Sequence, residues 1–228
     1  MNQAEPSRAV VSERGPSGAA GMGETPETPG VVIGNHHHKY TSTNPAIRYL
    51  TNRFLDHLEA MFDRVAAETP TARVAEVGCG EGEIAERLHG RWGDVTAVDL
   101  PDAGLRREWA TRPGPQFLHG DATRLPFPDD AFDVVASVEV LEHLRDPVAG
   151  LREYARVSRR HLVLSVPREP VFRIGNLIAA RHVRDLGNTP GHLNHWSSPD
   201  FIRFVSTVGA VADVAKPMPW TIVWVRLT

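Results

Sequence analysis

The stretch of sequence best suited to chemistry is Arg73–Gly82, which reads RVAEVGCGEG. A short apolar run carries one acid, Glu76, and leads into three glycines in the pattern Gly-x-Gly-x-Gly. Glycine lets the backbone turn tightly and come close to a ligand. Ile84 and Leu88 follow four residues apart, the spacing of one helix face. Because the N–H groups at a helix start bind polar groups of ligands, the stretch predicts a nucleotide site.

The spacing of the glycines indicates which kind of nucleotide is bound. The dinucleotide pattern Gly-x-Gly-x-x-Gly requires its third glycine at position 83, where the chain has Glu83, and Gly82 is one residue too early. An NAD site is therefore disfavoured. Asp99 ends the next predicted strand, where its carboxylate could accept hydrogen bonds from ribose hydroxyls. Glu76 would be costly in an apolar strand without a partner, and a ligand ammonium group would supply one.

The elements that must position these residues alternate between strand and helix. Apolar runs predict strands at 72–79, 94–99, 115–120, 132–138 and 161–166. Helical spacing predicts helices at 83–91, 102–111, 147–158 and 198–208, and two further strands are expected at 210–217 and 220–227. Such alternation indicates a parallel sheet covered by helices on both faces, with ligands bound beyond the carboxyl ends of its strands.

The N-terminal region changes character twice. Residues 1–34 are rich in Gly, Pro, Ser, Ala and Glu, which predicts a disordered tail. Three histidines at 36–38 could bind a metal, but a polar lead-in to the following helix is the favoured interpretation. Asn44 and Pro45 suit the cap and first turn of an amphipathic helix over 45–68. Residues 35–69 are expected to form an N-terminal lid, with Lys39 and Tyr40 closing over the site.

Composition narrows the possible functions of the 228 residues. The net charge of −3 argues against a nucleic acid partner. Cys79 stands alone, so no disulfide within the chain is expected. No apolar run approaches the ~20 residues of a membrane span, and no secretory signal is recognised. We therefore expect a cytoplasmic protein without a membrane partner, and the oligomeric state is left open.

Four blocks of sequence, in order, resemble the class I S-adenosylmethionine-dependent methyltransferases, and in particular the small-molecule enzymes of type 11. The blocks are VAEVGCGEG at 74–82 with Asp99, GDATRLPF at 120–127, FDVV at 132–135 and EVLEHL at 139–144. The resemblance covers about residues 70–167 and implies a methyltransferase domain over 35–228. It implies an α/β fold, a doubly wound Rossmann-like sheet of seven mostly parallel strands with the last strand antiparallel. It also implies S-adenosylmethionine as the cofactor.

The resemblance implies roles for residues at the strand ends. The amino acid part of the cofactor would be held by the first strand and its loop, through Glu76, Gly78, Cys79, Gly80 and Gly82. Later strand ends would hold the rest: Asp99 and Leu100 at the ribose, Asp121 and Ala122 at the adenine, and Ser137 and Glu139 at the methyl-transfer pocket.

The candidate groups for activating the methyl acceptor come from two segments. Methyl transfer from a sulfonium mainly requires alignment, and a base is needed when the nucleophile must lose a proton. The candidate catalytic residues are Glu142, His143, His192 and His195. A sharper hypothesis is a divalent metal held by Glu139, Glu142, His143 and His195, the first three sharing one face if 139–143 is helical. This set is similar to that of small-RNA 2′-O-methyltransferases, and its first half resembles ubiquinone-pathway O-methyltransferases. A metal-independent site is nevertheless favoured.

Residues 168–197 interrupt the alternation and are predicted to recognise the substrate. Trp196 could stack on a ring of the substrate. Four arginines could bind a carboxylate or phosphate: Arg168, Arg173, Arg181 and Arg184. We predict methyl transfer to a small-molecule acceptor, with an oxygen nucleophile favoured. The alternatives are a metal-assisted RNA 2′-O-methyltransferase and a non-catalytic cofactor-binding protein. The intact glycines and Asp99 argue against the latter.

Overall fold

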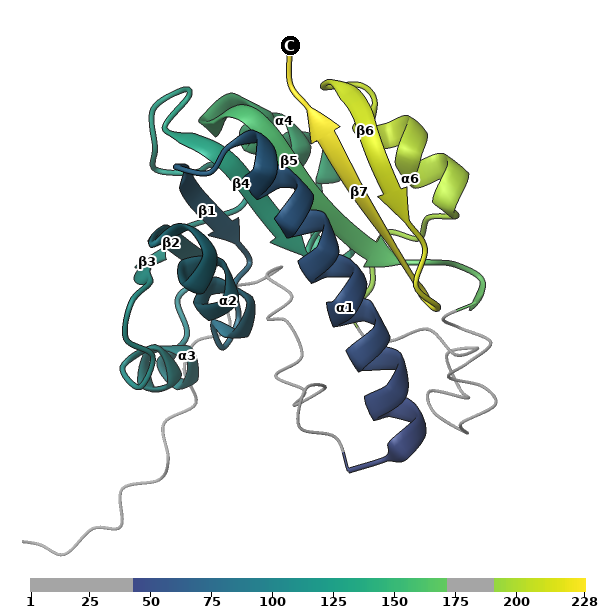
Figure 1. Cartoon of the computed structure of the whole chain (residues 1–228), viewed down its shortest axis with the longest axis horizontal. Coiled ribbons are helices and arrows are strands. Elements are labelled where there is room, and N and C mark those ends of the chain that lie inside the picture. Colours follow the sequence, from purple (N-terminus) through teal and green to yellow (C-terminus); the bar gives the residue numbers. More distant parts are fainter. Residues whose placement is uncertain (1–42, 172–190) are drawn as a thin grey trace, which may run out of the picture. The chain divides into compact units, whose positions relative to one another are not determined.

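The computed structural model describes residues 43–171 and 191–228. The predicted tail at 1–34, the histidines at 36–38, Lys39, Tyr40 and residues 172–190 of the predicted recognition segment lie outside the described residues. Seven strands form one sheet in the order β3-β2-β1-β4-β5-β7-β6 (Figure 1). In chain order they are β1 Arg73–Val77, β2 Asp94–Asp99, β3 Gln116–His119, β4 Phe132–Val138, β5 Ser158–Pro167, β6 Ala210–Ala215 and β7 Trp220–Arg226.

The strand directions confirm the predicted sheet. Strands β1 to β5 pair in parallel, whereas β7 is antiparallel to both of its neighbours, β5 and β6. Val74 of β1 pairs with Val95 of β2 on one side and with Val134 of β4 on the other. The strand order therefore reverses at β1, and ligands of such sheets bind beyond the carboxyl ends of the strands at this reversal.

Helices cover both faces of the sheet. On one face lie α1 Pro45–Glu68, α2 Glu83–Trp92 and α3 Ala103–Trp109, and on the other lie α4 Pro147–Val157 and α6 Ser198–Val205 (Figure 1). Apolar residues of each sheet face join the helices in two buried clusters, one per face. Because both faces are covered, the strands are apolar along most of their length, as predicted.

The predicted bounds of α1, residues 45–68, are confirmed, and a side-chain cap explains where the helix begins. The side chain of Asn44 accepts hydrogen bonds from the N–H groups of Ala46 (2.9 Å) and Ile47 (3.4 Å), which caps the helix start. The apolar face packs on the sheet, with Phe54 and Met61 almost completely buried. No helix in 43–171 or 191–228 has the length and apolar character required to cross a membrane.

Candidate functional site

The loop after β1 requires glycine at two positions. Gly78 and Gly82 have φ angles of +79° and +86°, in the left-handed region that side chains disfavour. A Cβ atom at Gly78 would collide with the side chain of Val140, and one at Gly82 would lie 2.8 Å from the ring of Phe117. The N–H of Gly78 donates to the carbonyl of Val98 at 2.7 Å. The loop therefore turns sharply at the end of β1 and lies against the ends of β2, β3 and β4.

The carboxylate of Asp99 ties this loop to the end of β2. Its Oδ2 accepts from the N–H of Gly80 at 2.6 Å and its Oδ1 accepts from the N–H of Leu100 at 2.7 Å. The indole of Trp109 donates to the carbonyl of Gly80 at 2.8 Å, so the loop is also held from α3. The N–H of Gly120, after β3, donates to the Asp99 carbonyl at 2.9 Å. Three strand ends thus converge on the predicted ribose-binding acid.

Two buried groups lie beneath the loop. Glu76 is 2% exposed and pairs in the sheet with Ala97 and Ala136, near the carboxyl end of β1. Cys79 is buried, and burial, together with the carboxylates of Glu76 and Asp99, raises the pKa of its thiol. The thiol therefore stays protonated at neutral pH, which suits packing rather than nucleophilic chemistry.

The predicted adenine-flanking residues follow β3 directly. Asp121 is exposed, and its Oδ1 accepts from the N–H (2.8 Å) and the hydroxyl (2.7 Å) of Thr123. This local turn fixes the backbone around Ala122, which is partly buried. Asp121 and Ala122 are the first and second residues after Gly120, whose N–H bonds to the carbonyl of Asp99, so they lie at the same sheet edge as Asp99.

The end of β4 carries a residue with unusual backbone geometry. Glu139 has a φ angle of +62°, which is uncommon for a residue other than glycine and often marks a functional site. Its Oε2 accepts from the indole of Trp220 at 2.6 Å and its Oε1 accepts from the hydroxyl of Ser165 at 3.2 Å. Glu139 is therefore held against β7 and β5. Ser137, two residues earlier, is 1% exposed inside the sheet.

The helical face predicted for residues 139–143 is not formed. The helical part of this segment is the single 3₁₀ turn η2, Leu141–His143, and Glu139 precedes it with a left-handed backbone. A turn of three residues cannot place Glu139 on one face with Glu142 and His143. The condition of the prediction, a helix over residues 139–143, is therefore not met, because Glu139 has a left-handed backbone and lies outside η2.

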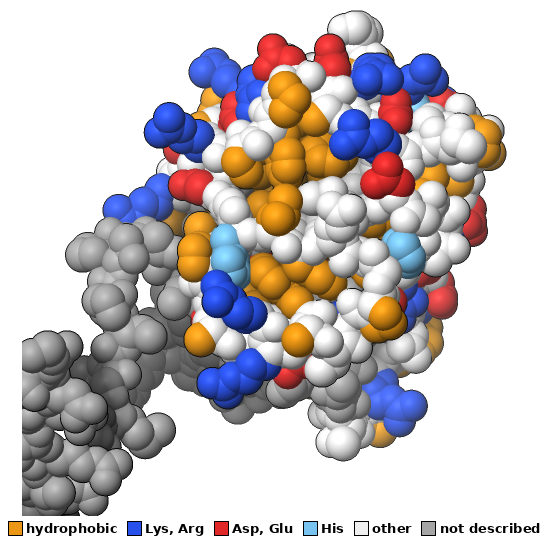
Figure 2. Space-filling model, turned by 90° about the vertical axis from the view of Figure 1, so that its left-hand side faces the viewer, with side chains coloured by type: hydrophobic (Ala, Val, Ile, Leu, Met, Phe, Trp, Pro, Cys, Tyr) orange, Lys and Arg blue, Asp and Glu red, His pale blue; other side chains and the backbone are white. Residues whose placement is uncertain are grey.

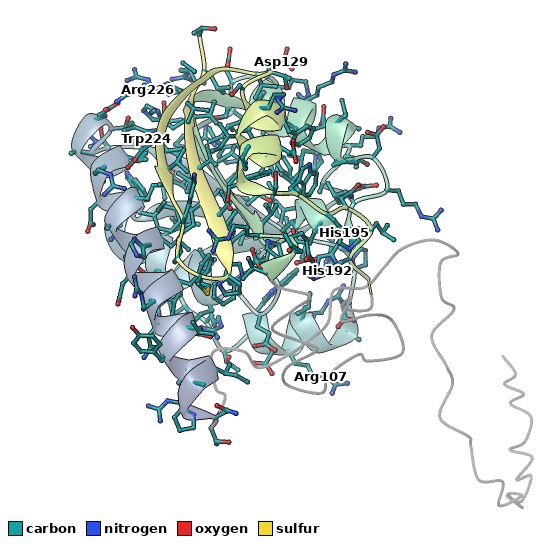
Figure 3. The ribbon with its side chains drawn as sticks, turned by 90° about the vertical axis from the view of Figure 1, so that its right-hand side faces the viewer. Arg107, Asp129, His192, His195, Trp224 and Arg226 are labelled. Carbon is teal, nitrogen blue, oxygen red and sulfur yellow. The ribbon has the colours of Figure 1, made fainter. Side chains whose placement is uncertain are left out.

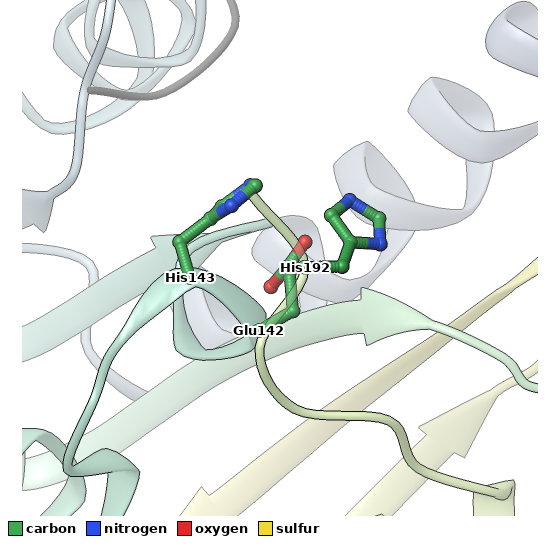
Figure 4. A group of neighbouring side chains, drawn as sticks. All are labelled: Glu142, His143 and His192. Atoms are coloured by element: carbon green, nitrogen blue, oxygen red, sulfur yellow. The ribbon is translucent and has the colours of Figure 1, made fainter. Parts of the chain in front are cut away.

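A different group of side chains gathers beside η2. Glu142, His143 and His192 each offer a ligand atom within 4.8 Å of the other two. Glu142 is 1% exposed and His192 is 9% exposed. The two imidazole rings lie edge to face with centroids 5.0 Å apart, and the carboxylate lies between them (Figure 4). The structure therefore brings together two catalytic candidates from η2 and one from a segment about 50 residues later.

The hydrogen bonds of His143 define its protonation pattern. Its Nδ1 lies 2.9 Å from the carbonyl oxygen of Gly191. Because a carbonyl only accepts hydrogen bonds, Nδ1 carries the proton of this bond. His195 is exposed and is not part of the group, so His192 occupies the position that the sequence analysis gave to His195. Figure 3 shows both histidines on the chain that leads to α6.

The described part of the predicted recognition segment packs on its neighbours. Arg168 forms a β-bridge with Trp196, and the N–H of Glu169 donates to the Trp196 carbonyl at 2.8 Å. The ring of Trp196 stacks on Phe204 of α6 with centroids 5.5 Å apart. Trp196 therefore packs against α6, and its stacking on an acceptor ring stays a prediction. The remaining predicted arginines lie outside the described residues: Arg173, Arg181 and Arg184.

Sequence reasoning missed two polar side chains at the site. Trp220 was predicted only as the first residue of a strand, yet its indole donates to the carboxylate of Glu139 across β5. Asn194 was not singled out, yet its amide donates to the carbonyls of Leu141 (3.1 Å) and Leu144 (2.6 Å) around η2. Neither contact has a local sequence signal, because each joins residues more than 45 positions apart.

Comparison with known proteins is consistent with this geometry. Residues 75–164 match the family model described as a methyltransferase domain. A probable S-adenosylmethionine-dependent methyltransferase of Mycobacterium tuberculosis is 27% identical over 203 residues, which cover 83% of this chain and 71% of that protein. The 27-O-demethylrifamycin SV methyltransferase of Amycolatopsis mediterranei is 33% identical over 139 residues, which cover 55% of this chain and 47% of that protein.

One further protein is similar in sequence, and one solved structure is similar in fold. A demethylmenaquinone methyltransferase of Renibacterium salmoninarum is 34% identical over 121 residues, which cover 53% of this chain and 50% of that protein. Among solved structures, the magnesium protoporphyrin IX methyltransferase of Synechocystis, with bound SAH, has a TM-score of 0.59 and 17% identity. The match covers 82% of this chain and 89% of that one. At this identity the likeness shows a shared fold.

Proposed function

Because the chain belongs to the class I S-adenosylmethionine-dependent methyltransferases, we propose that it methylates an oxygen atom of a small-molecule acceptor. The observation that carries the proposal is the group of Glu142, His143 and His192 beside η2. The turn η2 begins directly after Val140, whose side chain lies against Gly78 of the glycine loop. A proton-accepting group is thus close to the expected position of the methyl donor.

We assign the cofactor by the polar groups at the strand ends. The carboxylate of Asp99 ends β2 and accepts from the N–H groups of Gly80 and Leu100. A carboxylate at this place suits hydrogen bonds from the ribose hydroxyls. Glu76, buried at the end of β1, suits the ammonium group of the cofactor. Asp121 and Ala122 would flank the adenine, and Ser137 and Glu139 would line the methyl-transfer pocket.

The cluster beside η2 would activate the acceptor. When bound, S-adenosylmethionine supplies a methyl group whose C–S bond breaks, with the electron pair staying on sulfur, as the acceptor oxygen forms the new C–O bond. The protein must align the acceptor oxygen with this methyl group and remove the hydroxyl proton. Nε2 of His143 or a ring nitrogen of His192 takes the proton, and the nearby carboxylate of Glu142 stabilises the imidazolium.

Two of the similar proteins support an acceptor of low molecular weight. The names of the Renibacterium and Amycolatopsis enzymes specify demethylmenaquinone and 27-O-demethylrifamycin SV. Gly191 and His192 of the predicted recognition segment border the cluster, and we propose that this segment contacts the acceptor. Localisation in the cytoplasm stays a prediction.

The acceptor can be found by isotope labelling. The full chain is incubated with S-adenosylmethionine labelled in its methyl carbon and an extract of host cells, and labelled products are separated and weighed by mass spectrometry. The expected product is a small molecule heavier by one labelled methyl group, bonded to oxygen. Label found solely in RNA would contradict the proposed acceptor class.

The cluster also favours a second candidate, a metal-assisted RNA 2′-O-methyltransferase. Two imidazoles and a carboxylate suit a divalent transition metal, which would lower the pKa of a bound hydroxyl. Charge weighs against an RNA substrate, because the net charge is −3 and the face in Figure 2 intermingles acidic and basic side chains. Metal analysis of the purified protein and activity in a chelator decide. Full activity in the chelator, with no bound metal, eliminates the metal-assisted candidate.

A further inference from the structure

The segment 191–194 is attached to η2 by a compact set of hydrogen bonds. The N–H groups of Leu193 and Asn194 both donate to the carbonyl of Glu142, at 2.7 and 3.0 Å. The ring of His143 donates to the carbonyl of Gly191 at 2.9 Å. The amide of Asn194 adds bonds to the carbonyls of Leu141 and Leu144. His192 lies between these anchors, so their geometry sets where its ring is placed.

Asn194 makes the side-chain part of this attachment. The carbonyl of Leu141 already accepts from the N–H of Leu144 at 3.3 Å, and its second lone pair can accept another hydrogen bond. A primary amide carries two N–H groups on one nitrogen, so Asn194 can donate to the carbonyls of Leu141 and Leu144 at once. The bond to Leu144 is short, at 2.6 Å, and the bond to Leu141 is 3.1 Å. Residues 192–195 belong to no helix or strand, so these bonds substitute for secondary structure.

We infer that Asn194 is a positioning residue, which acts on the acceptor chemistry by holding His192 against Glu142 and His143. The inference rests on the proposed function, in which this cluster takes the acceptor proton. Asn194 itself does not touch the reacting atoms: its amide faces the backbone of η2. A displacement of a catalytic group by about 1 Å can cost roughly 100-fold in rate, so a single amide can matter this much.

The chemistry of the amide dictates the variants. Asn194→Asp has nearly the same shape but presents carboxylate oxygens to two carbonyl oxygens, so both hydrogen bonds are lost and repulsion replaces them. Asn194→Ala removes the donors without adding charge. Leu193→Ala is the matched control, because the Leu193 side chain is 47% exposed while its backbone N–H bond to Glu142 is retained.

The first test needs no acceptor. In the full chain with labelled histidine, NMR should show a cross-peak between the rings of His143 and His192, whose centroids are 5.0 Å apart. We expect Asn194→Ala to lose this cross-peak and to change the titration curve of His192, with S-adenosylmethionine affinity within about twofold of wild type. We expect Leu193→Ala to retain all three properties. Unchanged ring contacts and titration in a folded Asn194→Ala variant would overturn the inference.

The second test uses the acceptor identified by labelling. Asn194→Asp and Asn194→Ala should lower kcat roughly 10- to 100-fold, and either change should cost little more in a chain that already carries His192→Gln. Fully additive losses in these double variants would indicate a merely structural Asn194 and overturn the inference. If Asn194→Ala does not fold, Asn194→Ser, which keeps one donor, replaces it. Failure of the wild type to bind S-adenosylmethionine would contradict the proposed function. It would not affect the NMR test of Asn194, because the ring contacts are measured without the cofactor.

Discussion

The N–H of Gly80 donates a hydrogen bond of 2.6 Å to Oδ2 of Asp99, which joins the glycine loop after β1 to the end of β2. The same carboxylate accepts from the N–H of Leu100, so both of its oxygens are oriented by the backbone. Such a carboxylate is pre-organised, because little of its conformational freedom is left to lose when a ligand binds. This relationship makes Asp99 the residue whose change should affect cofactor binding most selectively.

Asp99→Asn should weaken the binding of S-adenosylmethionine while the fold is retained. The amide keeps the shape but turns an NH₂ group toward one of the two backbone donors, and it removes the charge that strengthens bonds to the ribose. Hydrogen bonds to charged groups contribute about 1.5–3 kcal/mol, which corresponds to roughly a 10- to 150-fold loss of affinity. Isothermal titration calorimetry measures this change.

A control for this experiment lies at the other end of the same strand. Asp94 begins β2, its side chain is 60% exposed, and it lies 3.6 Å from Arg73. Asp94→Asn should leave the cofactor affinity unchanged, because exposed ion pairs contribute little. Equal affinities for Asp99→Asn and wild type would contradict the assignment of Asp99.

Gly78→Ala should destabilise the protein and impair cofactor binding. The left-handed backbone at Gly78 costs an alanine about 1–2 kcal/mol, and its Cβ would displace Val140. Gly90→Ala is the comparison, since nothing lies within 4 Å of a Cβ there and its helical position favours alanine by about 0.5–1 kcal/mol. Thermal unfolding should show a lowered Tm for the first variant and an equal or higher Tm for the second. Equal stability of both variants would show that the turn is not under this constraint.

His192→Gln should reduce turnover without reducing cofactor affinity. Loss of a general base typically costs about 10²- to 10⁴-fold in rate. His195→Gln, three residues along the same segment but outside the cluster, should cost much less. The two variants are compared by kcat and by its pH profile with the labelled acceptor. A larger loss for His195→Gln would favour the histidine that sequence reasoning had placed in the metal group.

The stability of the fold should fall in mild acid because of His161. This residue is 5% exposed, and burial lowers the pKa of its imidazole. The charges of Glu68 and Asp133 oppose this shift, whereas those of Arg226 and Arg160 add to it. Nδ1 accepts from the indole of Trp224 at 3.3 Å, so protonation would remove an acceptor from a buried donor. The neutral ring is therefore the form that the native state favours.

The direction of the pH effect follows from linkage. A lowered pKa means that the unfolded chain binds the proton more tightly, so the native state loses stability as the pH falls below about 6.5, by at most about 1.4 kcal/mol per pH unit. The free energy of unfolding in urea is measured at about pH 7.5 and about pH 5.5. His161→Gln should show a smaller loss than wild type. An equal loss in both chains would remove His161 as the cause.

Apolar spacing was sufficient to predict several of the elements around the candidate site. The bounds of α1, β2 and β4 agree with the sequence prediction, because their apolar residues repeat at the helical or strand period up to a cap or a polar end. The start of β5 was missed by three residues. Its first part contains the exposed Arg159 and Arg160, which give no apolar signal, and pairing of Ser158 with Phe132 extends the strand.

The activating cluster could be predicted only in part. Glu142 and His143 follow β4 closely, so their place at the site was foreseen. The choice between His192 and His195 depends on contacts about 50 residues apart, in which Asn194 binds the backbone of η2. The left-handed backbone at Glu139 was also missed, because a glutamate gives no local indication of that conformation.

The most direct test of the central claim is a calorimetric titration of the full, folded chain with S-adenosylmethionine. We expect saturable binding at one site per chain, weakened by Asp99→Asn and unchanged by Asp94→Asn. Absence of binding by wild type, with folding established by circular dichroism on the same sample, would contradict it.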